Sequence, residues 1–406
     1  MMDVVRLTAA DFDEAMDFMN MVFSMSGGAT DFQRFLPKLY QPDDRLMRAH
    51  FAIRRAGRIR AVIGQYPMAM QIGGIQIPVS GIGGVCTHPG EQKSGLMRHL
   101  MTAVLADMEH EHYAFSVLGG QRQRYGYFGY EKCGSSPVFS LSKTNLRHFF
   151  RNQAPQEIRF VRINPENQSY NTHSAAQLQS WQAMMKSWFD RQPIHVIRSE
   201  ADFLTILSSR YARIWLAQTP EGRPAGYLLS DRDGTTVREI ITESTELLLP
   251  TAAAWVERQT SDAVSFYLPP WRPDAIAEIG KICEYASLEA ANSYRINDWP
   301  LVLSALLQVK GGQELLPDGL LRLGIHDQDR TSVFSLSWRD GQATCLETPS
   351  AEADLSFDRL SATRFIFGPL PPFWTAPQYA KVSPLLTNLC SAWFPLPLCW
   401  PTPDCV

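Results

Sequence analysis

A polar loop between two apolar segments carries the residue types of an anion site. Gln92-Lys93-Ser94-Gly95 follows an extended run that ends near Thr87, and an amphipathic helix starts directly after it. Backbone N–H groups at a helix start point outward together, and the helix dipole adds partial positive charge. Gly95 would let the backbone approach a ligand closely, and Lys93 would add a cation. The loop fits a phosphate cradle, with a plain strand-to-helix turn as the alternative; it is neither a Walker loop nor a GxGxxG fingerprint.

Other reactive side chains favour structural interpretations. His110 and His112 stand two positions apart, so they would point apart on a helix and make a poor metal site. The seven cysteines are scattered without a CxxC pair, which argues against a disulfide framework or a zinc ribbon and predicts reduced thiols. His88 could assist a proton transfer, but a histidine at a strand end is usually a polar rim residue. Arg122 and Arg124 fit either phosphate contacts or a solvated loop.

Length and composition describe a globular chain of several domains. The chain has 406 residues, of which 19% are charged and 45% hydrophobic. Its net charge of -3 gives no general attraction to nucleic acid or anionic lipid, so we expect no nucleic-acid partner. No run of about 18 apolar residues is present, and the N-terminal segment lacks the pattern of a signal peptide. These features predict no membrane span and a cytoplasmic location.

The elements around the loop form an α/β or α+β unit of about 140 residues. A capping-box pair, Thr8 and Asp11, predicts a helix start, and the apolar face of that helix would hold Phe12, Ala15, Met16, Met19, Val22 and Phe23. Residues 50–87 predict several strands with turns at Ala56-Gly57 and Gly73-Gly74. A helix follows the loop, and residues 114–118 predict another strand.

The rest of the chain predicts two further domains. All ten tryptophans lie from Trp181 onward, a shift that fits a boundary near residues 145 to 170. A hairpin turning at Glu221-Gly222, a helix and a strand then repeat the order of the first unit without its glycine-containing loop. From about residue 291, the pattern changes to antiparallel strands followed by a strand and a short helix. The proline- and aromatic-rich tail is expected to pack rather than to stay in solvent.

This order of elements resembles the GCN5-related N-acetyltransferase fold, whose pyrophosphate loop has the form Q/R-x-x-G-x-G/A. Residues 92–97 match, except that Met97 stands where Gly or Ala is usual. Together with the YGYFGY stretch at 125–130 and the segment AEADLSFDRLSATRFIFG, the whole order resembles the Eis (enhanced intracellular survival) family. The resemblance implies an α/β (α+β) fold: two tandem acetyltransferase-like domains with mixed sheets, at 1–147 and 148–290, and a sterol-carrier-protein-like α+β domain at 291–406.

The resemblance also implies acetyl-CoA as the acyl donor and no metal. The backbone of the strand segment Val85, Cys86 and Thr87 would meet the acetyl group and the pantetheine arm. The pyrophosphate would be bound by Gln92, Lys93, Ser94, Gly95, Leu96, Met97 and Arg98. The second domain, which lacks any Q-x-x-G-x-G segment, is expected to bind no cofactor.

Two residues receive catalytic roles from the resemblance. Tyr125 would protonate the departing thiolate, since a phenol with a pKa of about 10 carries its proton at neutral pH. Tyr127 and Tyr130 are the competing candidates. The carboxylate of Val406 would accept the proton of the amine, although the ending PTPDCV departs from the aromatic terminus associated with the family. Asp404 or a disordered end are the alternatives.

The expected activity is acetyl transfer to a primary amine of a small cationic molecule, such as a polyamine or an aminoglycoside. The resemblance implies a homo-oligomer, with a hexamer as the family's assembly. The alternative is a non-catalytic acyl-CoA- or lipid-binding or scaffold protein that retains the fold, because fold does not imply function. Met97 favours this alternative, whereas the loop and Tyr125 favour the enzyme. The third domain could hold lipid, or contribute packing and the chain terminus to the active site.

Overall fold

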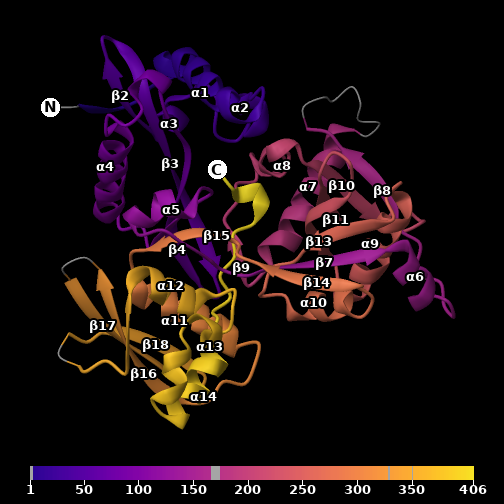
Figure 1. Cartoon of the computed structure of the whole chain (residues 1–406). Helices are drawn as coiled ribbons and strands as arrows, with labels where there is room; N and C mark the ends of the chain where they lie inside the picture. Colours follow the sequence, from indigo (N-terminus) through magenta and orange to yellow (C-terminus); the bar gives the residue numbers. More distant parts are fainter. Residues whose placement is uncertain (1–2, 166–173, 328–329, 350) are drawn as a thin grey trace. The chain divides into compact units, whose positions relative to one another are not determined.

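The computed structural model of the chain describes residues 3–165, 174–327, 330–349 and 351–406. It divides into two compact units (Figure 1). Unit 1 comprises residues 1–134, 290–398 and 405–406, and unit 2 comprises residues 135–289 and 399–404. The region of the tryptophan shift, 145 to 170, thus lies within unit 2. The division into domains at 1–147, 148–290 and 291–406 stays a prediction.

The first sheet of unit 1 contains the strand that leads into the polar loop. Its strands lie in the order β1-β2-β3-β4-β5-β15-β6. Strands β2, β3 and β4 form an antiparallel meander, β5 pairs in parallel with β4, and β15 pairs antiparallel with both β5 and β6. The bounds are Val4–Arg6 (β1), His50–Arg55 (β2), Arg58–Ile72 (β3), Ile75–Thr87 (β4), Phe115–Leu118 (β5), Glu131–Cys133 (β6) and Asn292–Ile296 (β15).

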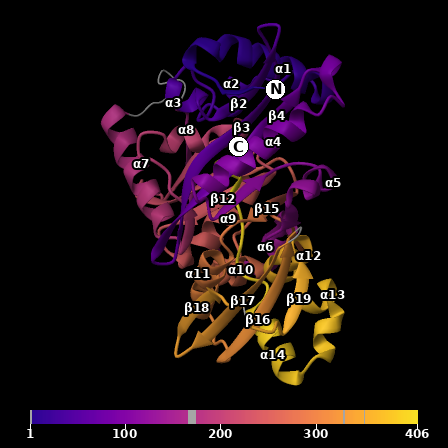
Figure 2. The ribbon, with the colours of Figure 1, turned by 90° about the vertical axis from the view of Figure 1, so that its left-hand side faces the viewer.

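Helices pack on both faces of this sheet, as Figure 2 shows for α1 and α4. The backbone N–H of Thr8 donates to Asp11 Oδ2 (2.8 Å) ahead of α1, and the predicted apolar face is confirmed because Phe12, Ala15, Met16 and Met19 are buried. One apolar cluster joins α1 to the sheet, and a second joins α4 to the opposite face. The helices are α1 (Phe12–Gly27), α2 (Phe32–Phe35), α3 (Asp44–Met47), α4 (Leu96–His110) and α5 (Arg122–Tyr125).

A second sheet of unit 1 is built from the C-terminal third of the chain. It has four strands in the order β18-β17-β16-β19, and the predicted antiparallel strands, final strand and short helix are confirmed. The likeness to sterol carrier proteins stays a prediction. The bounds are Gly319–Asp327 (β16), Arg330–Arg339 (β17), Gln342–Glu347 (β18), Leu355–Asp358 (β19), Trp299–Gly311 (α11), Arg359–Phe367 (α12), Pro372–Thr375 (α13) and Pro384–Trp393 (α14).

Unit 2 repeats the strand plan of the first sheet. Its seven strands lie in the order β14-β7-β13-β12-β11-β10-β8. Strands β12 and β13 pair in parallel, and helix α9 connects them in the chain. The hairpin at Glu221-Gly222 and the helix that follows are confirmed. The bounds of these strands are Ser136–Ser142 (β7), Arg159–Ile163 (β8), Arg213–Gln218 (β10), Pro224–Ser230 (β11), Thr236–Thr242 (β12), Ala263–Tyr267 (β13) and Tyr285–Glu289 (β14). The short strand β9 (Ile194–Val196) is not part of this sheet, and the helices are Lys143–Phe149 (α6), Ala175–Asp190 (α7), Phe203–Leu207 (α8), Leu248–Arg258 (α9) and Pro273–Gly280 (α10).

Three general properties concern only the described part of the chain. No helix there is long and apolar enough to cross a membrane. No group of three or more His, Cys, Asp or Glu residues there could hold a metal ion. The cysteines in these ranges form no disulfide, as the scattered spacing predicts.

Candidate active site

Strand β4 extends beyond its parallel neighbour at the start of the loop. The two strands pair from Val79 with Phe115 to Ile82 with Leu118, where β5 ends. Strand β4 continues to Thr87, and on its other side the register with β3 shifts around Gly84, which has φ +60°. The backbone of residues 83–87 therefore receives no ladder partner from β5. The predicted backbone site at Val85, Cys86 and Thr87 lies within this segment.

The polar loop turns tightly and leads directly into α4. Lys93 and Gly95 have φ values of +65° and +84°, and the first hydrogen bond into the helix runs from the His99 N–H to the Gly95 carbonyl (3.0 Å). The amides of residues 96–98 precede that bond, so they can donate to an external anion. The side chains of Gln92, Lys93, Ser94 and Arg98 are exposed beside them. These amides and side chains lie together at the start of α4, where the helix dipole adds partial positive charge.

Met97 packs inward. Its side chain is partly buried against the apolar cluster that contains Leu96 and Leu100 on the α4 face of the sheet. A larger residue at this position is therefore accommodated by the core.

Tyr125 is held in the same cluster as the start of α4. It is 6% exposed and packs with Ile82 and Leu96, and its ring lies directly over the backbone of Gly120. Burial raises the pKa of Tyr125, and the nearby Arg124 guanidinium opposes this rise. The phenol therefore carries its proton at neutral pH.

The two competing tyrosines occupy different surroundings. Tyr127 is 89% exposed. Tyr130 is buried, its hydroxyl is hydrogen-bonded to Ser116 (2.6 Å), and burial raises its pKa to about 12. Tyr125 and Tyr130 both lie in the buried cluster beside β4 and the start of α4, but the Tyr130 hydroxyl is bonded to Ser116 within the sheet.

A buried carboxylate anchors the helix that carries Tyr125. Glu131 on β6 accepts hydrogen bonds from Arg122 on α5 (2.5 and 2.9 Å) and from Arg364 on α12 (2.9 Å). Glu131 is 1% exposed, so this pairing satisfies a charge that would otherwise be costly to bury. Arg122 thus positions α5 through Glu131.

Val406 lies against the face of β4 opposite to Tyr125. A Cβ atom built on Gly81 would lie 2.7 Å from Val406 Cγ2, and one built on Gly83 would lie 2.8 Å from the Val406 carbonyl carbon. Val406 packs with the α1-side cluster, which includes Cys86. Because alternate residues of a strand point to opposite faces, Ile82 and Tyr125 lie on the other face.

A buried polar cluster borders the same stretch of β4. The Tyr66 hydroxyl is hydrogen-bonded to the Tyr40 hydroxyl (2.8 Å) and to His50 Nε2 (3.0 Å), and His50 Nδ1 lies 3.2 Å from the Met47 carbonyl oxygen. Burial lowers the pKa of His50 to about 4, so the ring is neutral. A Cβ atom at Gly84 would lie 3.0 Å from the Tyr40 hydroxyl.

Two features of the site were not predicted from the sequence. These are the glycines Gly81 and Gly83 that face Val406, and the buried cluster of Tyr40, His50 and Tyr66. The glycines of the segment SGIGGV were a usable signal, because glycines in a strand often mark the close approach of another backbone. Tyr40 lies in the loop between α2 and α3, His50 in β2 and Tyr66 in β3, and the three residues share no local pattern.

Residues 3–133 match the sequence profile of an acetyltransferase (GNAT) domain, which agrees with the splayed β4, the loop and α4. None of the curated protein sequences compared with this chain matches it.

Solved structures show the same fold over nearly the whole chain. A GCN5-related N-acetyltransferase from Kribbella flavida has a TM-score of 0.66 and 18% identity, covering 98% of each chain. A probable N-acyltransferase from Enterococcus faecalis has a TM-score of 0.66 and 13% identity, covering 96% of this chain and 97% of that one. Eis1 from Mycobacterium abscessus has a TM-score of 0.63 and 14% identity, covering 98% and 99%. The predicted fold of tandem acetyltransferase-like domains is thus confirmed.

Proposed function

We propose that this chain is an acetyl-CoA-dependent N-acetyltransferase that acts on a primary amine of a small cationic molecule. The observation that carries the proposal is the meeting of four features at β4. These are a strand that outruns its parallel neighbour, a loop that presents helix-start amides, the buried phenol of Tyr125 and the packed Val406. The acyl donor would lie along residues 85–87, with its pyrophosphate at residues 92–98.

The opposite placement of Tyr125 and Val406 suits direct transfer. The neutral amine attacks the thioester carbon, a C–N bond forms and the C–S bond breaks. The amine nitrogen then loses a proton to the Val406 carboxylate, and the thiolate takes a proton from Tyr125. The site would lie where β4 continues past the end of β5. The amine would enter from the face of β4 that carries Val406, and the thiol would leave on the face that carries Tyr125. Arg124 would stabilise the phenolate that remains on Tyr125, as its effect on the pKa of this group indicates.

The test is thiol release from acetyl-CoA with a panel of polyamines and aminoglycosides. Tyr125→Phe, and a chain extended by two residues beyond Val406, should each lower kcat by roughly 100-fold or more, because each removes a proton-transfer group. Affinity for acetyl-CoA should persist in both variants. Tyr127→Phe is the matched control, since its exposed ring should leave turnover unchanged.

The other outcomes are informative. Binding of acetyl-CoA without turnover of any amine would favour the alternative of a non-catalytic acyl-CoA- or lipid-binding protein. A chain that binds no acetyl-CoA would contradict the proposed role of the loop. Calorimetric titration should give one acetyl-CoA per chain, because the segment that leads into α9 in unit 2 lacks the Q-x-x-G pattern.

Further parts of the proposal concern the assembly and the setting. We propose a cytoplasmic homo-oligomer, with a hexamer as the assembly implied by the resemblance, and no nucleic-acid partner. We also propose that residues 291–406 form a sterol-carrier-like domain. Sedimentation velocity checks the first of these, and a monomer at working concentrations would contradict it.

A further inference from the structure

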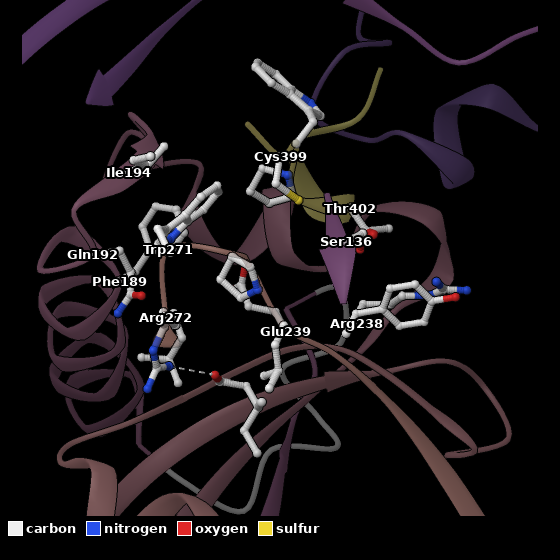
Figure 3. Close-up of a pocket in the computed structure, with 17 residues that line it drawn as sticks. Ser136, Phe189, Gln192, Ile194, Arg238, Glu239, Trp271, Arg272, Cys399 and Thr402 are labelled. Carbon is white, nitrogen blue, oxygen red and sulfur yellow. Dashed lines mark hydrogen bonds between the residues drawn. The ribbon is translucent and has the colours of Figure 1, made fainter. Parts of the chain in front are cut away.

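A cavity lies within unit 2 where strands β12 and β13 diverge. The two strands pair only at Thr236 with Ser265 and at Val237 with Phe266. The residues that follow on each strand then line a cavity (Figure 3). Tail residues 399–402, which belong to the same unit, complete the wall.

This cavity is the counterpart in unit 2 of the β4–β5 opening in unit 1. In both units an antiparallel meander ends in a strand that outruns its parallel neighbour, and a helix connects the two. The segment between β12 and α9, residues 243–247, contains no glycine and no Q-x-x-G pattern. The two units therefore share an opening between two parallel strands. Residues 243–247 lack the features that would bind a pyrophosphate there.

The side chains that line the cavity favour a ligand with a flat aromatic ring. Phe189, Tyr267, Trp271 and Trp400 contribute aromatic rings, and two prolines add further apolar surface. Figure 3 shows Phe189 and Trp271 on one side of the cavity and Arg238 on the other. Aromatic faces of this kind pack against aromatic ligands in offset or edge-to-face arrangements.

The charged groups of the wall favour an anion. Arg272 is 8% exposed, and its guanidinium contacts the Ile240 carbonyl oxygen and Asp274 at the long distances of 3.4 and 3.5 Å. On the opposite side of the cavity in Figure 3, the Arg238 guanidinium lies over the Tyr267 ring, 4.2 Å from its centroid. Glu239, the acidic residue among the described lining residues, accepts two hydrogen bonds from Arg198 (3.1 and 2.8 Å), a guanidinium that it shares with Asp404. A ligand carboxylate could therefore pair with Arg272 on one side of the cavity, with the charge of Arg238 on the other side.

We propose that this cavity is a binding site for a small aromatic carboxylate. The ring would pack beside Trp271, and the carboxylate would accept hydrogen bonds from Arg272, with Arg238 adding favourable charge. The site is separate from the residues assigned to acetyl transfer, and the proposal does not depend on that activity.

The test is calorimetric titration of the full chain with three probes that share one ring system. These are 2-naphthoate, 2-naphthalenemethanol and 2-naphthylmethylamine, which are an anion, a neutral molecule and a cation. We expect 2-naphthoate to bind at least about 10-fold more tightly than the other two, because a charge-assisted hydrogen bond to a buried guanidinium discriminates by this amount or more. Arg272→Met should remove that preference, and Arg272→Lys should retain part of it because the charge remains.

The controls separate this site from others. Arg159→Met, at an exposed arginine of β8, should leave the affinity for 2-naphthoate unchanged, as should Tyr125→Phe and saturation with acetyl-CoA. Equal affinity for the anion and the neutral probe, or an unchanged preference in a folded Arg272→Met or Arg272→Lys variant, would overturn the proposal. Loss of 2-naphthoate binding on saturation with acetyl-CoA would overturn it as well, since the probe would then occupy the transferase site.

Discussion

Arg198 is a fully buried arginine that pairs with two carboxylates within unit 2. Its guanidinium donates to both oxygens of Asp404 (3.0 and 2.8 Å) and of Glu239 (3.1 and 2.8 Å), and it stacks on the Phe189 ring at 3.7 Å. Burial alone would lower the pKa of Arg198, but Asp404 and Glu239 raise it well above its usual value. The residue is therefore charged at every working pH.

Arg198→Met should lower the free energy of unfolding by about 3–5 kcal/mol, because two buried carboxylates lose their counter-charge. Urea denaturation of the full chain measures the change. Adding Glu239→Gln and Asp404→Asn to this variant should recover part of the loss, since the unpaired charges are then removed. Arg159→Met, at an exposed ion pair, should change the free energy by less than about 1 kcal/mol. A similarly small effect of Arg198→Met would contradict this account.

Because His50 is buried and neutral, the free energy of unfolding should depend on pH. Its pKa is about 4 in the folded chain and 6.5 as the ordinary value, so the unfolded chain binds the proton more readily. The stabilisation is fully present above pH 6.5 and is lost as the pH falls toward 4. Between pH 7 and 4.5, the free energy of unfolding should fall by about 2–3 kcal/mol more in the native chain than in His50→Gln. A histidine ring resonance that titrates near pH 6.5 for His50 would contradict the buried, neutral state.

At the scale of elements, strand β4 depends on glycine where it meets Val406. Gly83→Ala would place a methyl group 2.8 Å from the Val406 carbonyl carbon, and backbone atoms cannot yield as easily as a flexible side chain. If the carboxylate acts as proposed, kcat should fall by about 100-fold while affinity for acetyl-CoA persists, since displacements near 1 Å cost this much. Gly74→Ala is the matched control, because its Cβ would meet nothing within 4 Å. Equal turnover in both variants would contradict the proposed position of the base.

Elements with local signals were predictable, whereas their distant partners were not. Helix α4 follows from its apolar period and from Gly95, and the turns at Gly57 and Gly73 follow from residue type. The insertion of β15 between β5 and β6 pairs residues that are far apart in sequence, and no periodicity encodes such a choice. The same holds for Val406 beside Gly83 and for Asp404 beside Arg198.

At the scale of the whole molecule, the first sheet needs a strand from the last third of the chain. Residues 1–147 alone would lack β15, leaving β5 and β6 as unpaired edges. We expect this fragment to aggregate or to unfold without cooperativity. Residues 1–134 joined to 290–398 by a flexible linker should regain soluble yield and a cooperative thermal transition measured by circular dichroism. Cooperative unfolding of the 1–147 fragment at the same temperature as the joined chain would contradict this expectation.

The late arrival of β15 also has a consequence for synthesis on the ribosome. After β6 has been made, about 160 further residues must be added before β15 exists, which takes roughly 10–30 s at usual elongation rates. Unit 2, most of which is encoded in that interval, can gather its own strands while the first sheet waits with open edges. A nascent chain stalled before residue 290 should therefore bind chaperones through its N-terminal segment, and one stalled well after residue 300 should release them.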